Sequence, residues 1–295
     1  MHERANHQSP RGSRRVWLIA GTGDGLKLAL TLQKRGWRLL VSVVSAEAAL
    51  AYPSLPNLNV RVGTIGGASG IRNLLDQARR EGDPFTAVVD ASHPFARQIT
   101  AALAQVWEEA KSGEGSGRLP QLLRLRRPDP GDLQVRRLQW LTDLDALGAL
   151  PLKGRRLLLA IGARELRRSV QLSPGAEHFA RLLPSAAALQ QGRAAGLAAE
   201  RLACLRPGDP QEFPVLRALL RRWRIDTILC RQSGGVTEAL WRRLATELNL
   251  ELLLLARPPE PKALRPLELA PLLQKLEALE MARDGDPHHG DHGHH

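Results

Sequence analysis

Short apolar runs alternate with amphipathic stretches along most of the chain, and this pattern predicts strands that take turns with helices. In the first half, the predicted strands are residues 16–20, 38–45, 59–62, 85–90 and 121–126. Helical patterns fill the intervals, most clearly from Ser69 to Arg80 and from Pro94 to Lys111. Five successive strand–helix units are typical of an open, doubly wound parallel sheet.

A second series of the same kind begins after the linker Asp129–Gly131. It predicts strands at residues 136–140, 155–161, 178–183, 202–206, 226–230 and 250–256. Its predicted helices are Thr142–Leu150, Gln211–Trp223 and Val236–Leu248. The sequence therefore indicates two α/β domains with parallel sheets, at residues 16–128 and 129–258. We expect the ligand in a cleft between them.

The two ends of the chain differ from these domains in composition. Residues 1–15 are polar and basic and have no apolar core, which predicts a disordered leader rather than a signal peptide. Residues 259–295 form a Pro-rich extension with a predicted helix at Leu264–Met281, interrupted by Pro266 and Pro271. A His-rich tail follows, and both a metal-handling role and a plain disordered tail stay open for it. Its histidines are His288, His289, His292, His294 and His295.

Composition narrows the class of protein. The formal net charge is +12, which favours an anionic partner. There is no basic-aromatic module or zinc-finger spacing for nucleic acid, and no apolar run long enough for a membrane span. Cys204 and Cys230 are too few for a disulfide framework. We therefore expect a cytoplasmic monomer or weak oligomer that binds neither nucleic acid nor membrane.

The first strand runs directly into a glycine-rich loop, Gly21–Gly25, and then into a helix. This order is typical of dinucleotide-binding domains, in which helix-terminal amides face phosphate. The match is incomplete, because Leu26 stands where the G-x-G-x-x-G pattern has its third glycine and Asp24 adds a negative charge. A tight turn between strand and helix is the alternative. The second strand ends in Ser45 rather than in an acid, which favours NADP over NAD.

A second polar loop follows the buried strand that ends at Val88–Val89. Asp90 and His93, three residues apart across a turn, are candidates for proton transfer. A loop-capping carboxylate and a hydrogen-bonded turn histidine are the alternatives. The body of the chain otherwise holds only His178, too few histidines for metal catalysis. A third polar loop, Ser233–Gly235, also follows a predicted strand.

Arginines recur at predicted strand ends in both domains, and Arg suits bidentate binding of carboxylates. An anionic ligand and ordinary solvated surface charge remain as alternatives for them. The set comprises Arg124, Arg126, Arg127, Arg164, Arg181, Arg206, Arg231 and Arg257.

Several motifs in this order give the chain a resemblance to a known family. They are Gly21–Gly25, Ser42–Ser45, Gly63–Gly67, Asp90–Ala96, Leu123–Pro128 and Ser233–Gly235, with Glu238 ahead of Arg257-Pro258. From Val16 to Pro258 the sequence resembles the precorrin-6A reductases of cobalamin biosynthesis. Arg231-Gln232 replaces the Lys-Asn that is usual in that family.

The resemblance implies two Rossmann-like domains and an NAD(P)H-dependent oxidoreductase. NADPH is the expected cofactor, with NADH as the alternative, and the expected reaction is reduction of one macrocycle double bond in a corrin precursor rich in carboxylates. It leaves open whether that substrate is metal-free or contains cobalt.

The candidate residues fall into three groups under this interpretation. The catalytic candidates are Asp90 and His93. The cofactor-binding candidates are Gly21, Thr22, Gly23, Asp24, Ser45, Ser233, Gly234 and Gly235. The substrate-binding candidates are Ser92, Arg124, Arg126, Arg164, Arg231 and Glu238.

Two other functions remain open from the sequence. One is a different NAD(P)-dependent reductase or epimerase that acts on an anionic small molecule. The other is a non-enzymatic protein that binds nucleotides or nucleic acid through its basic surface.

Overall fold

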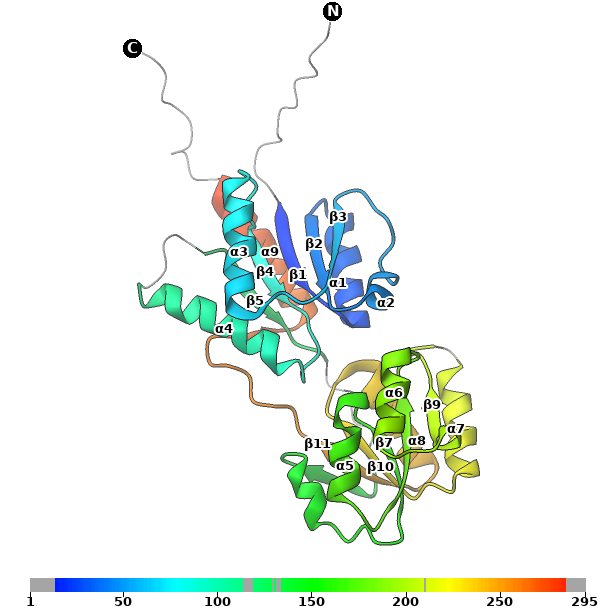
Figure 1. Cartoon of the computed structure of the whole chain (residues 1–295). Helices are drawn as coiled ribbons and strands as arrows, with labels where there is room; N and C mark the ends of the chain where they lie inside the picture. Colours follow the sequence, from blue (N-terminus) through cyan, green and yellow to red (C-terminus); the bar gives the residue numbers. More distant parts are fainter. Residues whose placement is uncertain (1–13, 114–118, 129, 131–133, 210, 285–295) are drawn as a thin grey trace, which may run out of the picture. The chain divides into compact units, whose positions relative to one another are not determined.

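The computed structural model describes residues 14–113, 119–128, 130, 134–209 and 211–284. Most of the predicted leader and the whole His-rich tail lie outside these residues. The fold has two compact units (Figure 1). The first unit is formed by the chain up to Arg127 together with the chain from Pro259 onward, and the second spans Pro128–Pro258.

The first unit is a parallel sheet with strand order β12-β5-β4-β1-β2-β3. Its elements are β1 (Arg15–Ile19), α1 (Gly23–Lys34), β2 (Arg38–Val43), α2 (Ala46–Ala49), β3 (Leu58–Val62), α3 (Gly67–Arg80), β4 (Ala87–Asp90), α4 (Arg97–Lys111), β5 (Gln121–Leu125), β12 (Pro266–Leu267) and α9 (Leu269–Asp284).

The central strand β1 explains why this sheet is covered on both faces. Successive strand side chains point to opposite faces, and every residue from Val16 to Ile19 is buried. Val16 and Leu18 pack with α1 and α9, whereas Trp17 and Ile19 pack with α3 and α4. The continuous apolar run in the sequence is therefore the signature of a doubly wound sheet.

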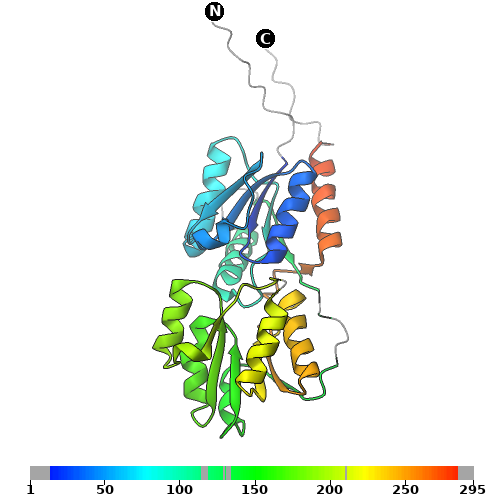
Figure 2. The same ribbon diagram turned by 90° about the vertical axis from the view of Figure 1, so that its right-hand side faces the viewer.

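The second unit repeats this plan with strand order β6-β11-β10-β7-β8-β9. Helices α5 and α6 lie on one face of its sheet, and α7 and α8 lie on the other (Figure 2). Its elements are β6 (Leu138–Leu141), the short 3-10 helix η1 (Asp145–Ala149), β7 (Arg156–Ala160), η2 (Ala163–Glu165), α5 (Leu166–Leu172), β8 (Glu177–Leu182), α6 (Ala186–Ala194), η3 (Ala199–Arg201), β9 (Leu202–Cys204), α7 (Glu212–Arg222), β10 (Thr227–Arg231), α8 (Gly235–Glu247) and β11 (Glu251–Leu255).

One helix expected from the sequence is shorter and tighter than predicted. The stretch Thr142–Leu150 forms only the 3-10 helix η1, and the Asp143 side chain just before it accepts a hydrogen bond from the Ala146 amide at 3.0 Å. Pro151 follows Leu150, which takes an extended conformation. A residue that precedes proline is disfavoured in the α region, so the turn cannot extend into an α-helix.

The segment after Pro258 differs most from expectation. The sequence predicts an extension with one helix, but β12 instead pairs in parallel with β5 and α9 packs against the first sheet. Pro266 lies in an edge strand, where a missing amide donor costs nothing. Pro271 lies in the first turn of α9, where proline is also tolerated. Leu272, Leu273 and Leu276 bury this helix in the first core.

The burial of α9 gives a stability prediction. Replacing Leu276 with Ala removes a fully buried side chain and should lower the free energy of unfolding by about 2–5 kcal/mol. Met281→Ala on the same helix, at an exposed position, is the matched control and should change it by less than about 0.5 kcal/mol. Chemical denaturation measures both. Equal effects of the two substitutions would contradict the packing of α9.

Candidate functional site

The two polar loops of the first unit, after β1 and after β4, lie together where the strand order of the sheet reverses. From β1 the chain proceeds to β2 on one side, and β4 lies on the other side of β1. Ile19 and Asp90 are register partners, and the Ala91 amide donates to the Ile19 carbonyl at 2.8 Å. Gly21–Asp24 and Asp90–His93 therefore leave neighbouring strands at the same edge. Such switch points are where open α/β sheets bind ligands.

The glycine loop is shaped by close packing between β1 and α1. A Cβ atom at Gly25 would lie 2.8 Å from the Ala20 Cβ, so only glycine lets the helix come this near to the strand. Gly25 thus performs the packing that the dinucleotide pattern assigns one position later, at Leu26. A Cβ at Gly21 or Gly23 would meet no atom within 4 Å, so these residues border open space.

Thr22 and Asp24 give the loop its polar character. The buried Thr22 Oγ1 has no hydrogen-bond partner among the described residues, and a phosphate oxygen would satisfy it. Asp24 Oδ2 lies 3.1 Å from Nε of Arg127, which is only 8% exposed. Because this ion pair neutralises Asp24, the acid does not oppose an anion at the start of α1. The loop therefore fits a cofactor pyrophosphate.

Ser45 lies at the end of β2 and caps the short helix α2. Its Oγ accepts a hydrogen bond from the Ala48 amide at 3.2 Å. Glu47 is fully exposed, and hydrogen bonds from its own backbone amide and from Ser45 lower its pKa. Tyr52 packs nearby, with its hydroxyl 3.5 Å from the Cβ position at Gly25, and burial raises its pKa to about 12.

Asp90 is fully buried, and both of its carboxylate oxygens are engaged. Oδ1 accepts the Ser92 amide at 2.9 Å. Oδ2 accepts the Thr100 hydroxyl at 2.9 Å and lies 2.6 Å from Nη1 of Arg124. Arg124 is itself only 2% exposed and also donates to the Ser92 hydroxyl at 3.2 Å. Three candidates from the sequence thus form one internal cluster.

His93 differs from Asp90, since it is only half-buried. Its Nδ1 accepts a hydrogen bond from the Phe95 amide at 3.1 Å, and its carbonyl accepts the Ala96 amide at 2.7 Å. The Nδ1 lone pair is therefore used, so the ring proton of the neutral form is on Nε2. The neutral ring of His93 then has its hydrogen-bond donor at Nε2.

The second unit has a switch point of its own, between β7 and β10. Cys230 and Ala160 are register partners there, so Gly162–Glu165 and Arg231–Gly235 leave the same edge of the sheet. A Cβ at Gly162 would lie 3.5 Å from Nη1 of Arg231. Burial lowers the pKa of Arg231, the Glu165 carboxylate raises it and the charge of Arg164 lowers it further. Because the charge of the exposed Arg164 acts on Arg231, the two guanidinium groups lie near each other at this edge.

The Ser233–Gly235 loop is largely satisfied by the protein itself. The Gly234 amide donates to the Glu238 carboxylate at 2.8 Å, and the Gly235 amide donates to the Pro128 carbonyl at 3.1 Å. Glu238 is almost fully buried and also pairs with Arg242 at 2.8 Å. Glu238 therefore shapes this loop, and the loop keeps two of its amides for internal bonds.

Comparison with known proteins decides the family. The model of the precorrin-6x reductase family, CbiJ/CobK, matches residues 15–277. The chain belongs to the precorrin-6x reductase family. It is accordingly a reductase of cobalamin biosynthesis, as the motifs predicted.

Individual relatives agree with this assignment. The cobalt-precorrin-6A reductase of Synechocystis sp. is 34% identical over 248 residues, which cover 82% of this chain and 88% of the relative. The precorrin-6A reductase of Mycobacterium tuberculosis is 31% identical over 250 residues, covering 84% and 90%. A solved structure of CobK precorrin-6A reductase has a TM-score of 0.68 at 26% identity, covering 90% of this chain and 96% of that one.

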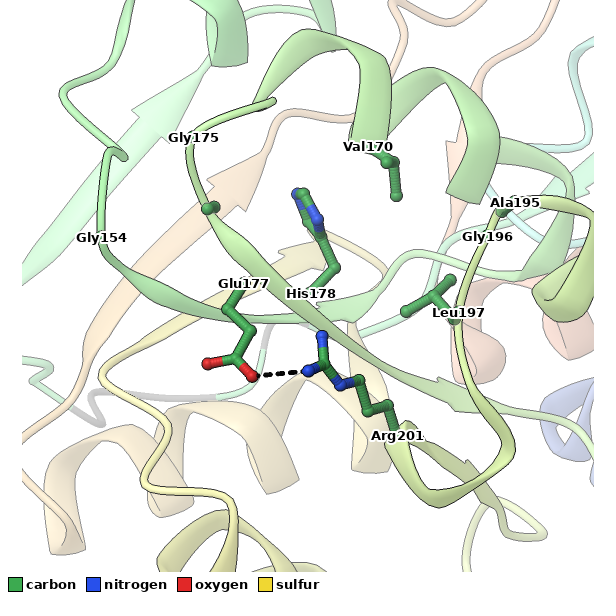
Figure 3. A pocket seen from close by; sticks show the side chains of 10 residues that line it. Gly154, Val170, Gly175, Glu177, His178, Ala195, Gly196, Leu197 and Arg201 are labelled. Carbon is green, nitrogen blue, oxygen red and sulfur yellow. Dashed lines mark ion pairs between the residues drawn. The ribbon is translucent and has the colours of Figure 1, made fainter.

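The second unit of this reductase has a cavity of about 350 Å³ (Figure 3), and no residue of Gly162–Glu165 or Arg231–Gly235 is among those that line it. His178 and Glu177, at the beginning of β8, line it together with Arg201. Burial lowers the pKa of His178, while Ser173 raises it and Arg201 lowers it. The amides of seven lining residues already donate to backbone carbonyls, which leaves few backbone donors to recognise a ligand. These are Gly154, Ala176, Glu177, Ala195, Gly196, Leu197 and Arg201.

Among the residues that the structure describes, no helix is both long and apolar enough to span a membrane. Within the same residues, no three His, Cys, Asp or Glu side chains are grouped to hold a metal ion.

Sequence reasoning did not identify three partners that complete the polar clusters of the reductase. Thr100 and Glu260 contact the Asp90–Arg124 cluster, and Arg127, noted only as one of many strand-end arginines, neutralises Asp24. Thr100 gave only a weak sequence signal as a partner of Asp90, because it lies ten residues later on the inner face of a predicted helix. Glu260 gave none, because it lies 136 residues beyond Arg124.

The contact at Gly25 predicts how the glycine loop responds to substitution. Gly25→Ala should push α1 away from β1 and lower the free energy of unfolding by about 1–3 kcal/mol. Gly23→Ala, where the new Cβ meets no atom within 4 Å, should be tolerated. Thermal and chemical denaturation of the two variants tests this. If the Gly25→Ala variant proved as stable as the Gly23→Ala variant, that result would contradict the packing role of Gly25.

Proposed function

We propose that the protein transfers a hydride from NADPH to one double bond of the precorrin-6A macrocycle or of its cobalt-containing form. The observation that carries this proposal is the glycine loop at the β1–β4 switch point, whose acid is neutralised by Arg127. Gly21, Thr22, Gly23 and Asp24 would hold the cofactor there, with the helix dipole of α1 facing the pyrophosphate.

The reaction needs a hydride, which the reduced nicotinamide supplies when bound, and a proton for the neighbouring carbon. We assign to His93 the hydrogen bond that orients the macrocycle or the water that delivers this proton. Its half-buried ring, with Nδ1 accepting the Phe95 amide, supports this role. We assign Asp90 to the support of that turn, since both of its oxygens are buried and engaged.

The carboxylates of the substrate call for cations that solvent can reach. Arg164 and Arg231 at the β7–β10 edge, and the exposed Arg126 after β5, meet that requirement. Arg124 and Glu238 are buried within the protein, so we assign both to positioning rather than to substrate contact. The location of the ligand in a cleft between the units stays a prediction.

NADPH is preferred in this proposal because Ser45 leaves room for a 2′-phosphate at the end of β2. Water screens the fully exposed Glu47 nearby. The Ser45→Asp variant keeps a side chain that caps α2 but adds a negative charge. Because this charge repels the 2′-phosphate, the Kd for NADPH should rise at least about tenfold, whereas the Kd for NADH should change little. Nicotinamide fluorescence measures both constants.

Ser45→Asn is the matched control, because it keeps the cap without the charge. It should bind both cofactors as the parent protein does. A Ser45→Asp variant that weakened NADPH and NADH equally would argue against the 2′-phosphate site. If neither precorrin-6A nor cobalt-precorrin-6A caused oxidation of NADPH or NADH, the proposed reaction itself would fail.

The substrate assignment gives a separate prediction. Arg164→Ala should raise the KM for the macrocycle by about three- to tenfold and leave the Kd for NADPH unchanged, because only a carboxylate contact is lost. Arg193→Ala, which removes an exposed cation elsewhere in the same unit, serves as the control. Steady-state kinetics would contradict the assignment if both substitutions raised the KM alike.

A further inference from the structure

The guanidinium of Arg124 binds two carboxylates from distant parts of the chain. Nη1 faces Asp90 at 2.6 Å, with the hydroxyls of Ser92 and Thr100 at 3.2 and 3.3 Å. The other edge faces Glu260, with Nε 3.1 Å from Oε2 and Nη2 3.3 Å from Oε1. This edge-on, bidentate geometry fixes both the position and the plane of the guanidinium.

Glu260 is not needed to neutralise the buried charge. Asp90 and Arg124 already balance each other at 0% and 2% exposure, whereas the Glu260 side chain is 32% exposed. The carboxylate of Glu260 therefore orients the Arg124 guanidinium rather than compensating its charge. Without it, the far edge of the guanidinium would have no carboxylate to align it among the contacts that the structure describes.

The orientation of Arg124 matters because of what Asp90 holds. The same carboxylate that binds Arg124 accepts the Ser92 amide, and Ser92 immediately precedes His93. Thr100 of α4 joins the cluster from the helix that follows the turn. The turn that carries His93 is thus fixed at both ends by groups that Arg124 contacts.

We propose that Glu260 is a positioning residue that acts through Arg124 on the His93 turn. The segment that returns to the first unit after Pro258 would then complete the scaffold of the candidate site. This inference rests on the proposed function for its kinetic readout only, since the geometry of His93 can be measured without substrate.

The test compares Glu260→Ala, Glu260→Gln and the control Glu268→Ala, an exposed acid in the same segment, all in the full chain. The first readout is the nitrogen resonances of His93 in a long-range ¹H–¹⁵N correlation spectrum, assigned by comparison with His93→Gln. The second is kcat and KM with NADPH and precorrin-6A.

Glu260→Ala should replace the single Nε2–H signature of His93 by averaged tautomers and lower kcat at least about fivefold, because the turn loses its fixed geometry. Glu260→Gln retains an oxygen acceptor for Arg124 and should largely restore both, and Glu268→Ala should match the parent. The proposal is overturned if Glu260→Ala lowers only the melting temperature. In that case the His93 signature would match that of the parent and kcat would stay within about twofold of it. A changed His93 signature in a protein whose parent form lacks reductase activity would count against the proposed function instead.

Discussion

The arrangement of the first unit depends on one buried guanidinium group, that of Arg124. A charge that is removed from water must find partners, and Arg124 finds them in Asp90, Ser92, Thr100 and Glu260. These partners come from the end of β4, the turn after it, α4 and the returning C-terminal segment. Arg124 makes all of these contacts only when each of these elements is in place. The turn that presents His93 therefore depends on the completeness of the whole unit.

The two units share one topology but use their glycine loops differently. In each, a central strand is flanked by the next strand on one side and the fourth on the other. The acid of the first loop, Asp24, pairs with Arg127, whereas Glu238 takes an amide of the second loop directly. The first loop thus keeps the Thr22 hydroxyl, which has no hydrogen-bond partner among the described residues, whereas two amides of the second loop are bound within the protein. We therefore assign the cofactor to the first unit.

Much of the fold could be predicted from the sequence, because buried parallel strands leave unmistakable apolar runs. The family also followed from the order of the motifs. The buried ion pair between Asp90 and Arg124 could not be predicted in the same way. An arginine at a strand end has the sequence pattern of a surface clamp, and Glu260, which aligns the far edge of its guanidinium, is distant in the chain. Likewise, two residues of strand that contain a proline, Pro266–Leu267, give no periodic signal, so β12 was missed.

The central claim is that His93 faces the ligands while Asp90 and Arg124 support it from within. A crystal structure of the full protein with NADP bound tests this claim most directly. We predict that the pyrophosphate lies against Gly21–Asp24 and that the Asp90 carboxylate remains bound to Arg124, out of contact with the ligand. A cofactor that lies elsewhere, or an Asp90 carboxylate that leaves Arg124 to touch the nicotinamide, would contradict it.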